Sequence, residues 1–199
     1  MNTGNDLSIY EDIQCRYFKK PGPENTPWVM EIAARRAKEL GIRNILLATC
    51  SGQTAFDALY IMGSDFNIIA VTHVTGFQKP DYQELSPEVR QQLEARGVTV
   101  LTHQHSFGGI GRAVRNKLST YQSDEIIAFA LRTFGQGTKV AIELALMAAD
   151  AGLVRTDEDV ISIGGTSKGA DTALLLQPAN SFHFFDLKVK EIICKPRVF

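Results

Sequence analysis

Four short, uninterrupted apolar runs, separated by segments with helical signals, constrain the fold of this chain more than any other feature. The runs lie at residues 44–49, 67–72, 98–102 and 159–164. A strand without polar alternation is buried on both faces, which is typical of a parallel sheet covered by helices on either side. Strands that alternate with helices predict a three-layer, doubly wound α/β/α fold with a mainly parallel sheet and right-handed crossovers.

Capping residues mark where the helices between these runs begin and end. Thr26 followed by Pro27 predicts a helix start, with Thr26 as the N-cap, and Gly41 predicts the end of that helix. Ser86 followed by Pro87 predicts another start in the same way. The helices therefore alternate with the strands, as the doubly wound fold requires.

A long helical insertion, residues 110–150, stands before the fourth run, so we expect the chain to cross over the sheet there. This crossover predicts the strand order third, second, first, fourth, with the first and fourth strands adjacent at the topological switch point. Ligands of open α/β sheets bind outside the carboxyl ends of the strands at that point. Two further strands are expected at residues 172–176 and 189–194, the last at an edge or in a hairpin.

Length and composition favour one domain, residues 1–199, in which residues 1–26 form a polar N-terminal arm. The 21 basic and 22 acidic residues are scattered and give a net charge of -1, so nucleic acid is not expected as a partner. No signal peptide opens the chain, and no apolar run approaches the ~18 residues that span a membrane. We therefore expect a cytoplasmic protein with no membrane partner.

The turn after the first run has the chemistry of an anion site. The segment Thr49-Cys50-Ser51-Gly52-Gln53-Thr54 places a glycine and several hydroxyl groups where a helix begins. Free backbone N–H groups and the positive end of the helix dipole bind phosphate at such a position. The candidate binding residues are Thr49, Ser51, Gly52, Gln53 and Thr54, and Gly52 would allow close approach of a ligand. The alternative is simple capping of the helix by Ser51.

A second loop rich in glycine and hydroxyls follows the fourth run, next to the first turn in the predicted strand order. Its spacing of glycine and lysine is not that of a Walker A motif. Its polar groups nevertheless suit an anionic ligand, and the alternative is a flexible connection. The candidate binding residues here are Gly164, Gly165, Thr166, Lys168, Asp171 and Thr172.

Two further glycine turns each carry a phenylalanine, and a histidine follows the second run. The candidates are Phe107, Gly108 and Gly109, Phe134 and Gly135, and His73. A phenylalanine at a glycine turn stacks on a flat ligand ring in one interpretation and holds its loop to the core in the other. The glycines near residue 109 lack the complete dinucleotide fingerprint and follow the third run, so NAD is disfavoured.

The sequence does not predict a metal site or a catalytic residue. His103 and His105 could share one side of a strand, but no carboxylate or cysteine is spaced to complete a metal site with them. Cys50 stands just before a helix N-terminus, where a thiolate can be stabilised. We prefer the interpretation that Cys50 is a small buried core residue. The sequence identifies no catalytic residue.

Together these segments resemble the C-terminal α/β domain of pyruvate kinase, and more closely the stand-alone proteins of archaea and bacteria that are similar to that domain. The Ser-Gly-x-Thr-Ala element at residues 51–55 is the most specific part. Stand-alone members also carry an opening like the one at residues 17–26. The likeness to the kinase domain covers residues 32–34, 44–55, 68–72, 97–101, 141–145, 152–154 and 159–165.

The resemblance implies a ligand class and leaves the chemistry open. In the kinase this domain is regulatory and holds a phosphorylated sugar on the loop that matches residues 51–54, whereas the stand-alone fold is associated with FMN. The resemblance therefore implies that the partner is a phosphorylated small molecule. In one interpretation this molecule is FMN and the protein is an oxidoreductase. In the other it is a sugar phosphate or a nucleotide and the protein is a non-catalytic sensor. The apolar segment at residues 182–185 suggests a homo-oligomer, although core burial explains that segment equally well.

Overall fold

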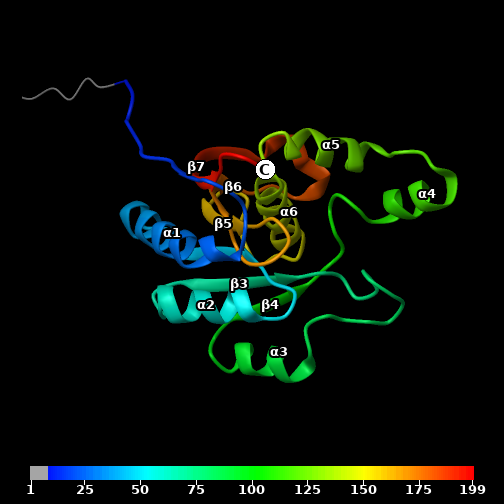
Figure 1. Ribbon diagram of the computed structural model, residues 1–199, viewed down its shortest axis with the longest axis horizontal. Coiled ribbons are helices and arrows are strands. Elements are labelled where there is room, and N and C mark those ends of the chain that lie inside the picture. The colour runs from blue at the N-terminus through cyan, green and yellow to red at the C-terminus, as the bar shows by residue number, and fades with distance from the viewer. Residues whose placement is uncertain (1–8) are drawn as a thin grey trace, which may run out of the picture.

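The computed structural model describes residues 9–199, so the first eight residues of the predicted N-terminal arm lie outside the described part of the chain. A seven-stranded sheet forms the middle layer, and helices cover both of its faces (Figure 1). The strands are β1 (Arg16–Phe18), β2 (Asn44–Ala48), β3 (Asn67–Thr72), β4 (Thr99–Thr102), β5 (Val160–Gly164), β6 (Thr172–Gln177) and β7 (Lys188–Pro196). The helices are α1 (Thr26–Leu40), α2 (Gln53–Met62), α3 (Pro87–Glu94), α4 (Ile110–Leu118), α5 (Ser123–Arg132) and α6 (Gln136–Asp150), with short 3-10 helices η1 (Pro23–Asn25) and η2 (Ser181–Asp186).

The sheet order is β1-β7-β6-β5-β2-β3-β4, which confirms the predicted succession of the four apolar runs. These runs are β4, β3, β2 and β5, and they pair in parallel. β6 is antiparallel to β5, because a short loop joins the two strands directly. β6 is also antiparallel to β7. The strand expected at an edge or in a hairpin, β7, pairs with β6 and is covered on its other side by β1. β1 was not predicted from the sequence, since three residues are too few to show a pattern.

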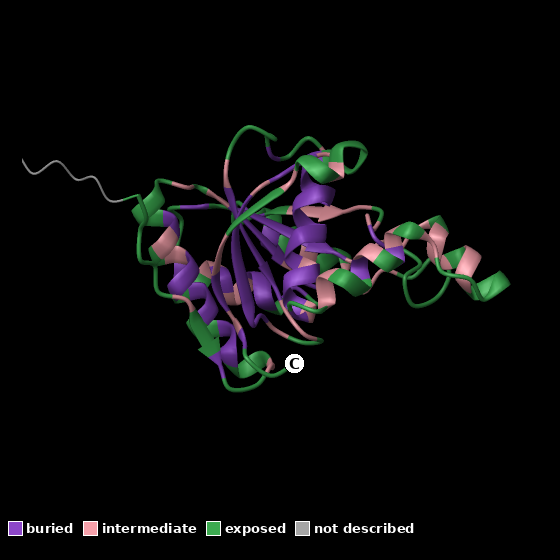
Figure 2. Cartoon of the chain, turned by 90° about the horizontal axis from the view of Figure 1, so that it is seen from above, coloured by how far each residue is buried: buried purple, intermediate pink, exposed green. Residues whose placement is uncertain are grey.

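Two separate apolar cores lie on the two faces of the sheet, which is buried on both sides (Figure 2). The core under α1, α2 and α3 includes Leu47 and Leu93. The core under α6 includes Leu46 and Met147. Leu46 and Leu47 are neighbours in β2 that point to opposite faces, so both must be apolar. This arrangement explains the uninterrupted apolar runs.

The helix ends follow the predicted signals with one exception. Ser86 caps α3 by accepting a hydrogen bond from the backbone N–H of Val89, at 3.3 Å. α1 ends at Gly41 in a left-handed conformation, as expected. The prediction of Thr26 as an N-cap is wrong, because Thr26 lies inside α1 and its Oγ1 accepts a hydrogen bond from Ala170 N at 2.9 Å. The hydroxyl therefore ties the start of α1 to the loop between β5 and β6.

The predicted helical insertion forms α4, α5 and α6. α6 is buried almost throughout and lies on β5 and β2. α4 and α5 form a helical arm, residues 110–132, that extends away from the three layers (Figures 1 and 2). No residue of α4 is buried. Among the described residues, no helix is long and apolar enough to cross a membrane.

Candidate functional site

The two predicted binding loops emerge side by side where the central parallel strands end. We call the carboxyl ends of these strands the carboxyl edge of the sheet. Leu47 of β2 pairs with Ile163 of β5, one residue before each strand ends. The β2–α2 turn, residues 49–52, and the β5–β6 loop, residues 165–171, therefore start next to each other. The N-termini of α1 and α6 lie at the same edge, because the Thr26 hydroxyl bonds Ala170 and Gly137 of α6 adjoins Thr172.

The first amide groups of α2 are free to bind an anion. Among the described side chains none caps α2, so the alternative in which Ser51 caps this helix is not what the structure shows. Thr49 Oγ1 instead accepts a hydrogen bond from Gly52 N at 3.0 Å, which fixes the turn. Ser51 and Gln53 are exposed, whereas Thr54 is buried. The uncapped N–H groups and the helix dipole give this turn a positive potential.

Gly52 is required by the packing of a neighbouring helix. Its backbone is left-handed, with a φ of 93°, and a β-carbon added there would lie 2.4 Å from Cγ1 of Val89 in α3. The bare α-carbon therefore accommodates α3. The interpretation of Gly52 as a point of close ligand approach has no contact in the structure to support it.

The β5–β6 loop is an ordered turn built around a buried carboxylate. Asp171 accepts hydrogen bonds from Thr166 N at 2.9 Å and from Thr172 Oγ1 at 2.8 Å. Lys168 stands exposed at the tip of the loop. Thr166 Oγ1 is buried and has no hydrogen-bond partner among the described residues. Since buried hydroxyls are normally paired, this unsatisfied group is the candidate donor of the loop.

The glycines of this loop also serve close packing. A β-carbon on Gly164 would lie 2.2 Å from the carbonyl oxygen of Gly137 in α6, so only glycine lets α6 approach the end of β5. A β-carbon on Gly165 would lie 2.3 Å from the carbonyl oxygen of Gly169, within the loop itself. These glycines shape the loop and hold it against α6.

The structure separates the predicted aromatic candidates. Phe107 is buried with its ring edge-on to Phe184, so it holds its loop to the core. Gly108 and Gly109 lead from it into α4. Phe134 and Gly135 precede α6 beside β7, where Lys195 Nζ donates to the Phe134 carbonyl. β7 is four strands from β3 in the sheet order, so Phe134 is remote from His73.

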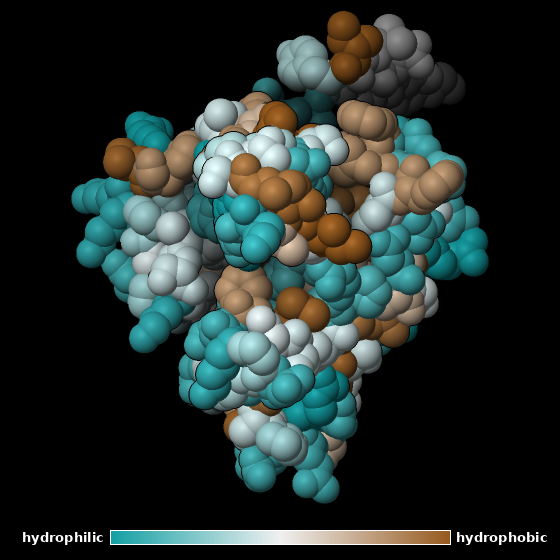
Figure 3. Space-filling model, turned by 90° about the vertical axis from the view of Figure 1, so that its right-hand side faces the viewer, coloured by the Kyte–Doolittle hydropathy of each residue, from teal (hydrophilic) through white to brown (hydrophobic). Residues whose placement is uncertain are grey.

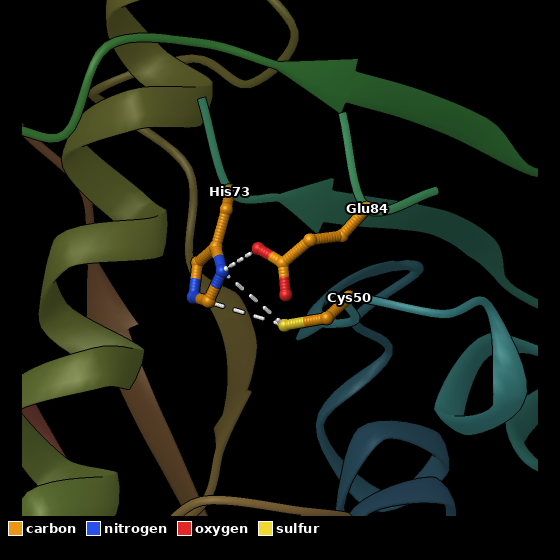
Figure 4. A group of neighbouring side chains, drawn as sticks. All are labelled: Cys50, His73 and Glu84. Atoms are coloured by element: carbon orange, nitrogen blue, oxygen red, sulfur yellow. Dashed lines mark hydrogen bonds and ion pairs between the residues drawn. The ribbon is translucent and has the colours of Figure 1, made fainter. Parts of the chain in front are cut away.

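His73 is the predicted residue with the most extensive contacts at this edge. Its Nδ1 lies 2.5 Å from Glu84 Oε2 and 3.5 Å from Cys50 Sγ (Figure 4). Cys50 follows β2, His73 follows β3, and Glu84 comes from the loop before α3. We call these three residues the Cys50 cluster.

Two glutamines fix the carboxylate of this cluster. Gln83 Nε2 donates to the His73 carbonyl at 3.0 Å, and Gln83 Oε1 accepts from Leu85 N at 3.1 Å. These bonds fold the loop back onto the end of β3 on either side of Glu84. Gln78 Nε2 donates to Glu84 Oε1 at 2.7 Å, which leaves Oε2 directed at the imidazole.

The thiol of Cys50 is not arranged as a nucleophile. Burial, and next the charge of Glu84, raise the pKa of Cys50 to about 11, so the thiol is protonated at neutral pH. Its Sγ lies 3.5 Å from Nδ1 and 3.7 Å from Nε2 of His73, nearly equidistant from the two ring nitrogens. It therefore does not lie along the lone pair of either nitrogen, as proton transfer would require. The expectation of Cys50 as a core residue is also incomplete, since this thiol is only half-buried.

A second polar network connects this edge to α6. His105 Nδ1 lies 3.6 Å from Glu143 Oε2, and Lys139 pairs with the same carboxylate. Burial alone would raise the pKa of Glu143, but the contact with His105 and the charge of Lys139 outweigh it and lower this pKa to about 2. Burial lowers the pKa of Lys139. The pair is a buried ion pair that also anchors the Phe107 backbone N–H, at 3.0 Å from Glu143 Oε1.

Aromatic rings link the two networks. Phe77 stacks on His73, with ring centroids 4.0 Å apart and planes 24° apart, and lies 5.2 Å from the His105 ring. The Arg112 guanidinium of α4 lies 5.4 Å from the Phe77 centroid. A flat ligand ring entering here would join an existing stack of rings and a cation.

A cationic pocket adjoins this aromatic group beneath the helical arm. The pocket has a volume of about 230 Å³ and is lined by the residues Phe107, Arg112, Arg115, Glu125, Ala128, Phe129 and Arg132. Its three arginines and one glutamate leave two net positive charges. The Nε of Arg112 is buried without a hydrogen-bond partner among the described residues. We call this the arginine pocket, and its chemistry suits an acidic group.

Most of these polar groups were not predictable from the sequence, because they come from distant segments. Glu84 stands in an irregular loop, and Glu143 and Lys139 lie on a helix whose pattern indicated only burial. The one available signal was a pair of opposite charges four residues apart in an otherwise apolar helix, since ions are rarely buried unless paired.

Comparison with known proteins gives the family. Two solved structures of pyruvate kinase from Cryptosporidium parvum are similar to part of the chain. One, in complex with ADP, is 20% identical with a TM-score of 0.37, over 78% of this chain and 24% of the kinase. The other is 19% identical with a TM-score of 0.41, over 80% of this chain and 24% of the kinase. The chain thus spans about a quarter of the length of either kinase. The model of the pyruvate kinase alpha/beta domain family matches residues 28–176, from α1 to β6, and the chain belongs to this family.

Proposed function

We propose that this protein binds a phosphate-bearing small molecule at the carboxyl edge, and that this molecule is FMN. One observation carries the proposal: the uncapped N-terminus of α2 lies beside a loop whose buried Thr166 hydroxyl has no hydrogen-bond partner within residues 9–199. The family match supports it, because the matched residues 28–176 include the Ser-Gly-x-Thr turn at residues 51–54.

The phosphate group would be held by backbone amides and hydroxyls. The N–H groups of Gln53 and Thr54 are the first of α2, and Ser51 is exposed beside them. Thr166 would donate from the other loop, with Lys168 adding positive charge. The N-termini of α1 and α6 add the positive ends of two more helix dipoles. A dianion is the ligand that such a site stabilises best.

The ring group would lie against the aromatic residues. His73, Phe77 and His105 form a group of rings that a flavin ring can extend, whereas a sugar ring cannot stack in this way. This feature favours FMN over a sugar phosphate. A bound flavin supplies hydride or electron transfer, so the protein would then be an oxidoreductase. The side chains of this chain would bind and orient the flavin.

A second candidate ligand is a sugar bisphosphate, bound by a non-catalytic sensor module. The arginine pocket favours this alternative, because a second phosphate would find cationic partners there. In that case Arg112 and Arg132 would contribute to affinity, whereas the single phosphate of FMN would be held by the β2–α2 turn and the β5–β6 loop alone.

A thermal-shift panel tests the proposal and separates the two ligands. FMN at 100 times its dissociation constant should stabilise the fold by about 2.7 kcal/mol. Ser51→Glu places a carboxylate at the proposed phosphate position on an exposed residue, so this variant should fold normally and bind at least about tenfold more weakly. A larger shift with a sugar bisphosphate, lost in Arg112→Leu, would favour the sensor. If neither ligand shifts the melting temperature, the proposal is wrong.

A further inference from the structure

Cys50, His73 and Glu84 bring three different metal-ligating groups into one place. One ligand atom from each lies within 4.8 Å of the other two, and all three residues are half-buried (Figure 4). We propose that the Cys50 cluster is a binding site for a divalent metal ion of the zinc class. The site shares His73 with the proposed flavin-ring contact but involves none of the groups proposed to hold phosphate, so titration with the metal alone, without FMN, tests it separately from the proposed function.

The distances agree with tetrahedral coordination after a small movement. Zinc binds sulfur at about 2.3 Å and nitrogen at about 2.0–2.1 Å, which separates the two ligand atoms by about 3.5 Å in a tetrahedron. Cys50 Sγ and His73 Nδ1 are 3.5 Å apart. His73 Nδ1 and Glu84 Oε2 are 2.5 Å apart, so the carboxylate would need to move outward by about 0.8 Å to admit the ion. Glu84 lies in a loop, where such a movement needs no change in a strand.

The ligand set is selective for zinc among the common divalent ions. Thiolate and imidazole are soft and borderline ligands that magnesium and calcium do not favour. Three protein ligands with the fourth position left to water or a ligand oxygen are typical of a reactive zinc site. His105 is not the fourth ligand, since its Nδ1 faces Glu143 and its Nε2 accepts the backbone N–H of Val74 at 3.5 Å.

The residues around the cluster already hold the ligands in a binding orientation. Gln78 donates to Glu84 Oε1, so Oε2 is the oxygen presented to the ion. Gln83 and the Thr72 hydroxyl both donate to the His73 carbonyl, at 3.0 and 2.9 Å, which fixes the backbone that carries the imidazole. Such outer contacts are a regular feature of metal sites, and they orient the primary ligands.

Binding must displace the proton of the thiol. His73 and Glu84 are the groups that face Cys50, whose thiol must give up its proton to ligate the ion as a thiolate. Zinc and the thiol therefore give the zinc thiolate and one released proton for each ion bound. Isothermal titration in two buffers of different ionisation enthalpy measures this proton directly.

Cobalt(II) titration of the protein tests the site with the metal alone. The titration uses a Cys15→Ser background, because Cys15 is a half-buried thiol near the β1–β7 edge. We expect one cobalt ion per chain, with a thiolate-to-cobalt charge-transfer band in the near ultraviolet and the intense visible bands of a tetrahedral ion. Competition by zinc should abolish both. Cys50→Ser should remove the charge-transfer band, and Glu84→Gln should weaken binding at least about tenfold.

Matched controls exclude nonspecific binding and misfolding. His103→Gln changes a histidine outside the cluster and should leave the titration unchanged, and the melting curve of each metal-free variant shows whether it folds. Zinc should also protect Cys50 from alkylation, as followed by mass spectrometry. Equal cobalt binding by Cys50→Ser, a spectrum without the thiolate band, or alkylation of Cys50 unaffected by zinc would each overturn the proposal.

Discussion

The buried Lys139–Glu143 pair is the residue-scale feature with the largest expected effect on stability. Glu143→Gln keeps the size of the side chain but leaves Lys139 buried without a counter-charge. We expect a loss of about 3–5 kcal/mol in the free energy of unfolding, measured by urea denaturation. Glu31→Gln, on the exposed face of α1, is the matched control and should change it little. Equal effects of the two variants would contradict the assignment of a buried ion pair.

The same pair predicts a pH dependence with a definite sign. The pKa of Glu143 is lowered to about 2 in the folded chain, from the usual 4.3–4.5 of an unfolded glutamate. Its contribution to stability is therefore complete above the unfolded pKa and is lost as the pH falls from about 4.5 to 2. The stability of Glu143→Gln should fall less steeply over this window than that of the wild type. If the free energies of unfolding of the two proteins fall in parallel over this window, Glu143 is not the group that causes the pH dependence.

Gly52 shows how far sequence reasoning reaches at this scale. A turn glycine was recognisable, but its neighbour Val89 was not, because nothing in the spacing indicates that α3 lies against the turn. Gly52→Ala adds both left-handed backbone strain and a clash with Val89. Gly97→Ala adds only the strain, since φ at Gly97 is 84° and no neighbouring atom lies within 4 Å of the added β-carbon. We expect Gly97→Ala to cost about 1–2 kcal/mol and Gly52→Ala about 1–3 kcal/mol more. Val89→Ala should recover part of the difference in urea denaturation, and equal costs would contradict the packing role.

At the scale of elements, the strands were predictable and the arm was not. Short uninterrupted apolar runs between helical signals are typical of strands in a covered sheet, so β2 to β5 and their order followed from the sequence. Nothing in the pattern of residues 110–132 showed that α4 and α5 would leave the layers. Figure 3 shows apolar side chains on this side of the molecule, and Ile110, Leu118, Ile126 and Phe129 are all exposed.

The helical arm should be the least stable helical unit of the fold. α4 buries no residue, whereas α6 is buried almost throughout. Because local stability follows burial, the amides of α4 should exchange with solvent orders of magnitude faster than those of α6. Hydrogen-exchange mass spectrometry of peptides from the two helices measures this difference. Equal protection of α4 and α6 would mean that the arm is covered in solution.

At the scale of the whole molecule, the predicted homo-oligomer stays a prediction. The segment at residues 182–185 lies within η2. Phe182 and Phe185 are 93% and 90% exposed, so core burial does not explain why these two positions are aromatic. If η2 mediates self-association, Phe182→Ser with Phe185→Ser should lower the sedimentation coefficient at micromolar concentration. A wild-type chain that sediments as a monomer would contradict the expectation.

The central claim, a phosphate site between the β2–α2 turn and the β5–β6 loop, depends most directly on the Thr166 hydroxyl. Thr166→Val keeps the shape of the side chain and removes the unpartnered hydroxyl. In calorimetric titration with FMN, this variant should bind about 10- to 100-fold more weakly than the wild type, since a hydrogen bond to a charged group is worth about 1.5–3 kcal/mol. Thr120→Val, at an exposed position between α4 and α5, should bind like the wild type. Unchanged affinity in Thr166→Val would contradict the account.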